Sequence, residues 1–121
     1  MINLSRIEDY RENNRIEAKK ALGGLPESIW ETYSSFSNTL GGIILLGVEE
    51  HKDRTLHPIE LPDPQALVDK FRRILADRRY VSCDVLGDDG VKTELAEGKR
   101  IVVITVPRAP RRLRPVYIGG D

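Results

Sequence analysis

The chain has 121 residues, 40% of them hydrophobic and 31% charged, and its 19 basic side chains balance 19 acidic ones. This composition indicates one globular domain and excludes a disordered chain. The net charge of zero excludes a protein that is basic throughout and wraps nucleic acid, but it does not exclude a local basic patch. A single cysteine, Cys83, excludes an intrachain disulfide and a four-cysteine zinc site.

The first predicted element is a short strand over residues 15–21. Side chains alternate between the two faces of a strand, so this one has a charged face and an apolar face. The charged face carries Arg15, Glu17 and Lys19, and the apolar face carries Ile16 and Ala18.

A helix is predicted next, over residues 27–39, and it ends at Gly41-Gly42. Its core face carries apolar side chains at helical spacing, namely Ile29, Tyr33, Phe36 and Leu40. The double glycine could offer backbone amides to a phosphate, but it follows the C-terminal end of a helix, where the dipole disfavours anions. A helix stop with tight packing against the next strand is therefore the favoured interpretation.

A buried central strand is predicted over Ile43–Val48, because this run is wholly apolar apart from Gly47 and rich in β-branched residues. A loop then leads to a second strand near residues 56–61. Asp63-Pro64 is a typical helix start, and the apolar spacing that follows predicts an amphipathic helix over residues 64–79.

The rest of the chain reads as a β-meander. Strands are predicted over residues 80–86, 91–95 and 99–106, with Val81, Cys83 and Val85 pointing inward in the first of them. Because helices and strands do not alternate strictly, we predict an α+β fold in which a mixed, mostly antiparallel sheet packs with two main helices.

A set of acidic side chains is the first candidate site: Glu12, Glu17, Glu49 and Glu50. Carboxylates leaving the ends of strands are held rigidly and still reach solvent, so two or three that converge could hold Mg²⁺ or Mn²⁺. Solvated charges at strand ends are common, and from spacing alone that second interpretation is favoured.

A basic run is the second candidate site. Residues 99–120 contain no acidic side chain, and the prolines predict an extended, exposed segment over residues 107–115. Arginine suits bidentate contact with phosphate, so the run indicates a polyanionic partner. A solubilising loop that pairs with acids elsewhere in the chain is an equally weighted alternative. The run contains Lys99, Arg100, Arg108, Arg111, Arg112 and Arg114.

These residues together resemble the Schlafen AlbA-like domain. The resemblance lies in Glu12 with Glu17-Ala18-Lys19, in residues 33–50 (YSSFSNTLGGIILLGVEE), in the strand that ends at Val106-Pro107, and in Arg114-Pro115-Val116-Tyr117. It implies an α+β domain of bacterial transcriptional regulators that binds nucleic acid, DNA or RNA, and that is often described as binding ATP. No ATP-binding motif stands in the sequence.

The resemblance also implies a runner-up function. In animal Schlafens the related domain is an endoribonuclease that uses three carboxylates and a divalent ion, and these positions correspond to Glu12, Glu17 and Glu50, with Lys19 beside them. Two features of the sequence depart from that pattern, because Ala18 replaces an aromatic residue and Glu49-Glu50 replaces two aspartates. The animal enzymes also build a clamp from two such lobes, so a homodimer would be needed to mimic it.

Three expectations complete the prediction. Residues 1–121 form one domain, the N-terminal part of a longer protein. The protein is cytoplasmic and has no membrane partner, because no apolar run approaches the roughly 20 residues of a spanning helix and the start lacks a signal-peptide core. The carboxylates and the arginine-rich segment lie near one another at one edge of the fold.

Overall fold

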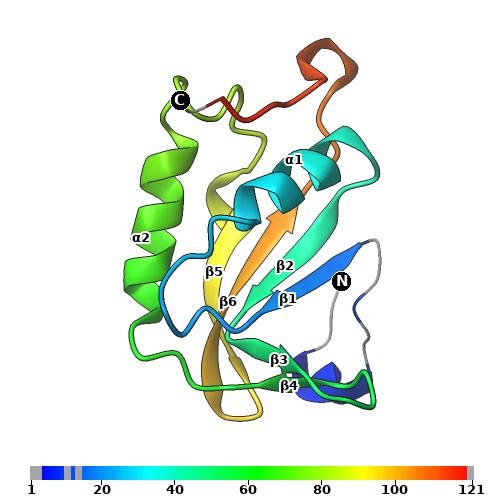
Figure 1. Ribbon diagram of the computed structural model, residues 1–121, viewed down its shortest axis with the longest axis vertical. Helices are drawn as coiled ribbons and strands as arrows, with labels where there is room; N and C mark the ends of the chain where they lie inside the picture. Colours follow the sequence, from blue (N-terminus) through cyan, green and yellow to red (C-terminus); the bar gives the residue numbers. More distant parts are fainter. Residues whose placement is uncertain (1–3, 10–11, 13–14, 120–121) are drawn as a thin grey trace.

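The computed structural model describes residues 4–9, residue 12 and residues 15–119 (Figure 1). The elements in chain order are η1 (Leu4–Asp9), β1 (Ile16–Lys19), α1 (Ile29–Asn38), β2 (Gly42–Leu46), β3 (Val48–Glu50), β4 (Leu56–Pro58), α2 (Pro64–Leu75), η2 (Asp88–Gly90), β5 (Val91–Ala96), β6 (Lys99–Val106) and η3 (Arg111–Leu113), where η marks a 3-10 helix. No helix in this described part of the chain is long and apolar enough to cross a membrane.

Four strands form a mixed sheet in the order β1-β2-β6-β5. β1 runs parallel to β2, whereas β2 pairs with β6 and β6 with β5 in antiparallel fashion. β3 and β4 form a separate antiparallel hairpin. The predicted α+β class, with a mostly antiparallel sheet and two main helices, is confirmed.

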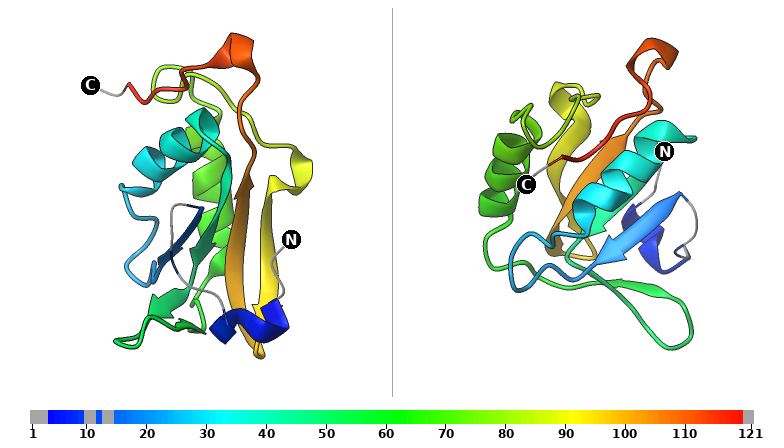
Figure 2. Two further views of the ribbon diagram at one scale, coloured as in Figure 1. Left: turned by 90° about the vertical axis from the view of Figure 1, so that its right-hand side faces the viewer. Right: turned by 45° about the horizontal axis from the view of Figure 1, so that its top comes forward.

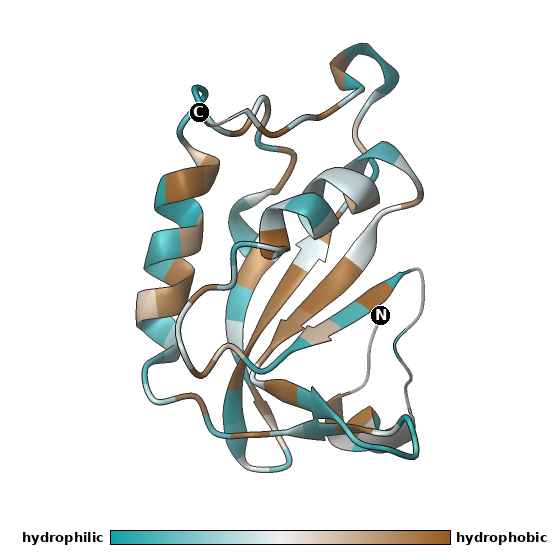
Figure 3. Cartoon of the chain, viewed as in Figure 1, coloured by the Kyte–Doolittle hydropathy of each residue, from teal (hydrophilic) through white to brown (hydrophobic). Residues whose placement is uncertain are grey.

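The alternation of apolar side chains in β2 and β6 gives the sheet two buried faces. α1 and α2 pack on the same face, over Ile44, Leu46, Val102 and Ile104 (Figure 2). The other face packs against η1 and the β3–β4 hairpin through Leu45 and Ile101. Figure 3 shows apolar colouring along both β2 and β6, as expected for strands buried on both sides.

Gly47 divides the predicted strand Ile43–Val48 into β2 and β3. Its φ of +89° is a backbone conformation that residues with a side chain rarely adopt, and a Cβ at this position would lie 2.7 Å from Leu61 Cγ. The Gly47 N–H donates to Lys19 O at the end of β1. This turn directs β3 out of the main sheet to pair with β4. The expected return strand near residues 56–61 is therefore present, but it pairs with β3 alone and not with the buried strand β2.

The strand predicted over residues 80–86 is wrong. This segment forms only an isolated bridge, between Val81 and Ile118. Its backbone bonds to a side chain of α1: the buried Tyr33 hydroxyl donates to Cys83 O (2.7 Å) and accepts from Val85 N–H (3.0 Å). The inward residues were nevertheless chosen correctly, since Val81 is buried and Cys83 and Val85 pack against the core.

Replacing Tyr33 by phenylalanine should lower the free energy of unfolding by about 1–2 kcal/mol at neutral pH, because two hydrogen bonds are lost. Burial raises the pKa of Tyr33 to about 12. The unfolded chain loses this proton near pH 10, so wild-type stability should be intact below pH 10 and fall as the pH rises toward 12. Urea unfolding at several alkaline pH values checks this. A wild-type decline no steeper than that of Tyr33→Phe would contradict it.

Candidate nucleic-acid interface

The arginine segment, defined here as residues 108–114, follows β6 and lies beside the C-terminal end of α1 (Figure 1). Both of its ends are anchored by buried residues, because Ala109 is 2% exposed and Val116 is 1% exposed. The Ala109 N–H donates to Ser37 O in α1. The predicted extended conformation is interrupted by η3, a single 3-10 turn.

Asn38 holds the far end of this segment. Its side-chain amide pairs with the backbone of Val116 in both directions, since Asn38 Nδ2 donates to Val116 O (2.7 Å) and Val116 N–H donates to Asn38 Oδ1 (2.6 Å). Ser34, one helical turn earlier, also donates to Val116 O. The Ser-x-x-x-Asn spacing in α1 therefore fixes the path of a segment almost eighty residues later.

The arginine side chains in this segment have no anionic partner in the part of the chain that the structure describes. Arg108, Arg111 and Arg112 are exposed, and Arg114 is half-buried. The four guanidinium groups take part in none of the ion pairs or side-chain hydrogen bonds among the described residues, and the Nε atom of Arg114 is buried without a hydrogen-bond partner.

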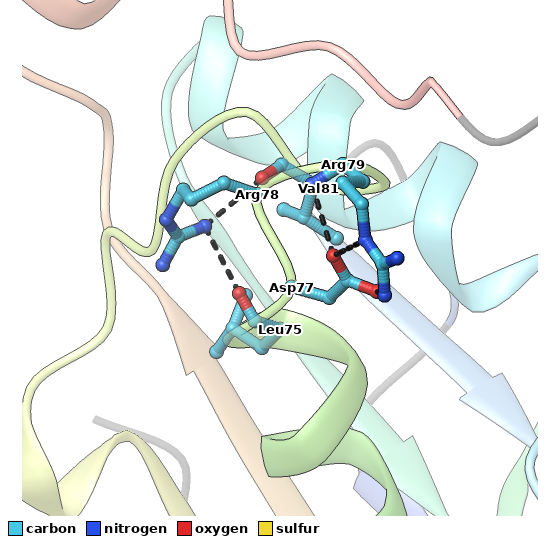
Figure 4. A network of polar contacts seen from close by, with 5 residues as sticks. All are labelled: Leu75, Asp77, Arg78, Arg79 and Val81. Atoms are coloured by element: carbon cyan, nitrogen blue, oxygen red, sulfur yellow. Dashed lines mark hydrogen bonds and ion pairs between the residues drawn. The ribbon is translucent and has the colours of Figure 1, made fainter.

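Other arginines of the fold are used differently. Arg78 donates to Leu75 O and Val81 O beyond the end of α2, and Arg79 pairs with Asp77 (Figure 4). Arg100 pairs with Glu60 at 2.7 Å. Lys99 and Arg100 open β6, whereas the arginine segment follows its end, so the basic run of the sequence divides between two ends of the sheet.

The predicted carboxylates take separate partners. Glu12 accepts from the Ala18 N–H at the outer edge of β1 (2.9 Å), and Glu17 lies 3.6 Å from Lys19 Nζ, which also donates to Ser28 Oγ before α1. Glu50 is exposed at the end of β3. Among the described residues no three His, Cys, Asp or Glu side chains are grouped closely enough to hold one metal ion.

The expectation that the carboxylates and the arginine segment lie together is wrong for Glu50. Gly42 pairs with Val106 at one end of the β2–β6 ladder, and Leu46 pairs with Val102 toward the other. The arginine segment follows Val106, whereas the hairpin that bears Glu50 follows Leu46. The two therefore lie at opposite ends of the sheet, at the top and the bottom of Figure 1.

A polar cluster on the β3–β4 hairpin was not predicted. Glu49 pairs with Lys20 (3.1 Å) and lies 3.4 Å from His51 Nε2, and the His51 and His57 rings stack with centroids 3.6 Å apart. The hydrogen bond and charge of Lys20 lower the pKa of Glu49. The pairing of Glu49 with His57 across the hairpin could have been inferred only from the strand register.

The fold and its anchored basic segment define a small α+β domain with a surface suited to a polyanion. A family model described as "Schlafen, AlbA_2" matches residues 12–118, so the chain belongs to the Schlafen AlbA_2 family. A similar solved structure is the solution NMR structure of the N-terminal domain of a RecG-related protein, named for its relation to an ATP-dependent DNA helicase, from Nitrosomonas europaea. The two share 25% sequence identity with a TM-score of 0.76 over 100% of this chain and 83% of that one. A comparison with curated proteins gave no match.

Proposed function

We propose that this domain binds nucleic acid through the arginine segment and serves as the nucleic-acid-binding part of a transcriptional regulator. One observation carries the proposal: four guanidinium groups lie on an anchored segment and have no carboxylate partner in the described structure. Guanidinium groups bind phosphate oxygens bidentately, and a cluster without counter-charges raises the local positive potential.

The comparisons support a nucleic-acid partner. The family is associated with nucleic-acid binding, and the similar RecG-related protein is named after a DNA helicase. Contacts to phosphates position a protein on its ligand but do not read the base sequence. We therefore expect binding to DNA and RNA with little dependence on sequence.

The test is the salt dependence of binding. Replacing Arg111 and Arg112 together by alanine should reduce the slope of log affinity against log salt by about two units, because each phosphate contact contributes about one. Fluorescence anisotropy with a labelled DNA duplex, and with RNA of the same sequence, measures the slope across a salt series.

The matched control is Lys99→Ala/Arg100→Ala. This control also removes two adjacent exposed cations. They are the first two residues of β6, so they lie at the end of that strand opposite to the arginine segment. This control should leave the slope within about half a unit of wild type. Equal slopes for wild type and for the Arg111/Arg112 variant would remove the arginine segment from the interface.

Two further roles stay predictions from the resemblance. One is a metal-dependent endoribonuclease that uses Glu12, Glu17 and Glu50 with Mg²⁺ or Mn²⁺, and the other is binding of ATP. No contact among the described residues favours either of them over the binding role.

A further inference from the structure

β5 is an edge strand, and its outer side pairs with no other strand among the described residues. It ends the four-stranded sheet beside β6, and the left view of Figure 2 shows it as the outermost strand. α2 packs against β5 and η1 lies near it. Within the described residues, however, the backbone of residues 91–96 makes no backbone hydrogen bond outside the β5–β6 ladder.

The turn between β5 and β6 determines which backbone groups point outward. Glu97 and Gly98 both have positive φ, as in a two-residue type I′ turn, and Ala96 pairs with Lys99. The carbonyl before such a turn accepts from the N–H after it, so the backbone groups of Ala96 face β6. Because these groups alternate along a strand, those of Val91, Thr93 and Leu95 face away from the sheet.

This outer edge is complementary to itself. If a second copy pairs in antiparallel fashion about a two-fold axis at Thr93, Lys92 lies opposite Glu94 of the other copy, and Val91 lies opposite Leu95. Lys92 and Thr93 are exposed, Glu94 is half-buried, and Leu95 is 65% exposed. Neither Lys92 nor Glu94 has an ion-pair partner in the described structure. Two opposite-charge pairs would therefore form, one on each side of the axis.

The neighbouring registers are disfavoured by charge. An axis at residue 92 would place Lys92 against its own copy, and an axis at residue 94 would do the same with Glu94. Like charges directly opposite one another destabilise a strand pair. The sequence of β5 thus favours one symmetric register over its two neighbours.

We propose that two copies of this chain associate through β5, so that their sheets join into one continuous sheet. The two-fold axis would place the arginine segments at opposite ends of the joined sheet, because each segment follows the end of β6 far from the β5–β6 turn. The interface uses neither the arginine segment nor any carboxylate of the acidic set, so it stands independently of the proposed function.

Charge reversal tests the proposal in sedimentation equilibrium with the full chain and no nucleic acid. Lys92→Glu places the new carboxylate against Glu94 of the second copy twice, and Glu94→Lys places two ammonium groups together. Each single variant should raise the dimer dissociation constant about tenfold. The double variant restores opposite charges and should return the constant to the wild-type value.

A mixture of the two single variants is the most discriminating measurement, because only the heterodimer regains both opposite-charge pairs. It should associate as tightly as wild type, whereas each variant alone does not. Thermal melting confirms that each variant is folded. A wild-type chain that stays monomeric across the concentration series would overturn the proposal, and so would single variants that associate as wild type does, or a mixture that does not recover.

Discussion

Replacing Asn38 by leucine is expected to lower the free energy of unfolding by about 3 kcal/mol, although the new side chain suits a helix better. The Val116 N–H would lose its only partner in the described structure, and Val116 O would keep only Ser34 Oγ. Val116 is 1% exposed, so water cannot replace the lost partner without opening the packing. A buried backbone donor left unpaired costs about 1–3 kcal/mol by itself.

This substitution should also loosen the arginine segment. Trypsin cleaves after arginine, and Arg111 and Arg112 lie on the segment that Asn38 anchors. Limited digestion under conditions in which both proteins stay mostly folded should therefore cut the variant faster at these residues. Nucleic-acid affinity should fall as well, because a mobile segment must be ordered on binding.

Ser35→Leu is the matched control, since Ser35 lies on the same helix and is exposed. It adds the same side chain to α1 but should shift stability by about 0.5 kcal/mol or less. Urea unfolding curves compare the two variants. If Asn38→Leu unfolds at the same urea concentration as Ser35→Leu, the amide pairing with Val116 contributes nothing to stability.

Elements with a strong local signal were predicted well from the sequence. β6 has its predicted limits, Lys99–Val106, because an apolar run between charged residues and Pro107 leaves little choice. α2 begins at Pro64 as predicted, and the Asp63 side chain caps it by accepting from the Ala66 N–H. The face assignment of β1 was also correct, since Ile16 and Ala18 pack against the second core cluster.

The errors arise where a distant partner decides the local structure. Residues 80–86 alternate like a strand, yet the Tyr33 hydroxyl occupies the backbone groups of Cys83 and Val85. Leu40 follows the helical spacing, but α1 ends at Asn38 and Leu40 is 60% exposed. In both cases the apolar spacing is present in the sequence. The secondary structure is set by something that this spacing does not encode, namely a contact with Tyr33 in the first case and the end of α1 in the second.

The candidate site was also only partly predictable, because its geometry depends on residues that are distant in sequence. That the arginines lack acidic neighbours in sequence was visible from residues 99–120, but that they lack them in space depends on the topology. β6 runs antiparallel to β2, so the end of β6 lies far from the hairpin that follows β2. Single-sequence periodicity does not give the direction of a strand relative to its neighbours, which is why the placement of Glu50 relative to the arginines was mispredicted.

Gly42→Val should destabilise the domain by about 3 kcal/mol, whereas β propensity alone predicts a gain from valine in a strand. A Cβ at Gly42 would lie 2.6 Å from two carbons of the Phe36 ring, and that ring is 5% exposed in the core. Gly42 also pairs with Val106, so β2 cannot shift there without disturbing the central ladder. A decrease in the free energy of unfolding would therefore indicate that tight packing of α1 on β2 dominates at this position. An increase would indicate that the intrinsic β propensity of valine dominates.

A double-mutant cycle assigns the cost to that contact. Phe36→Leu creates space beside position 42, so Gly42→Val should cost less in that background, and the coupling should exceed about 1 kcal/mol. Gly23→Val is the control, because no atom lies within 4 Å of a Cβ built there. The same loss in both backgrounds would mean that contact with the Phe36 ring is not the cause of the cost at Gly42.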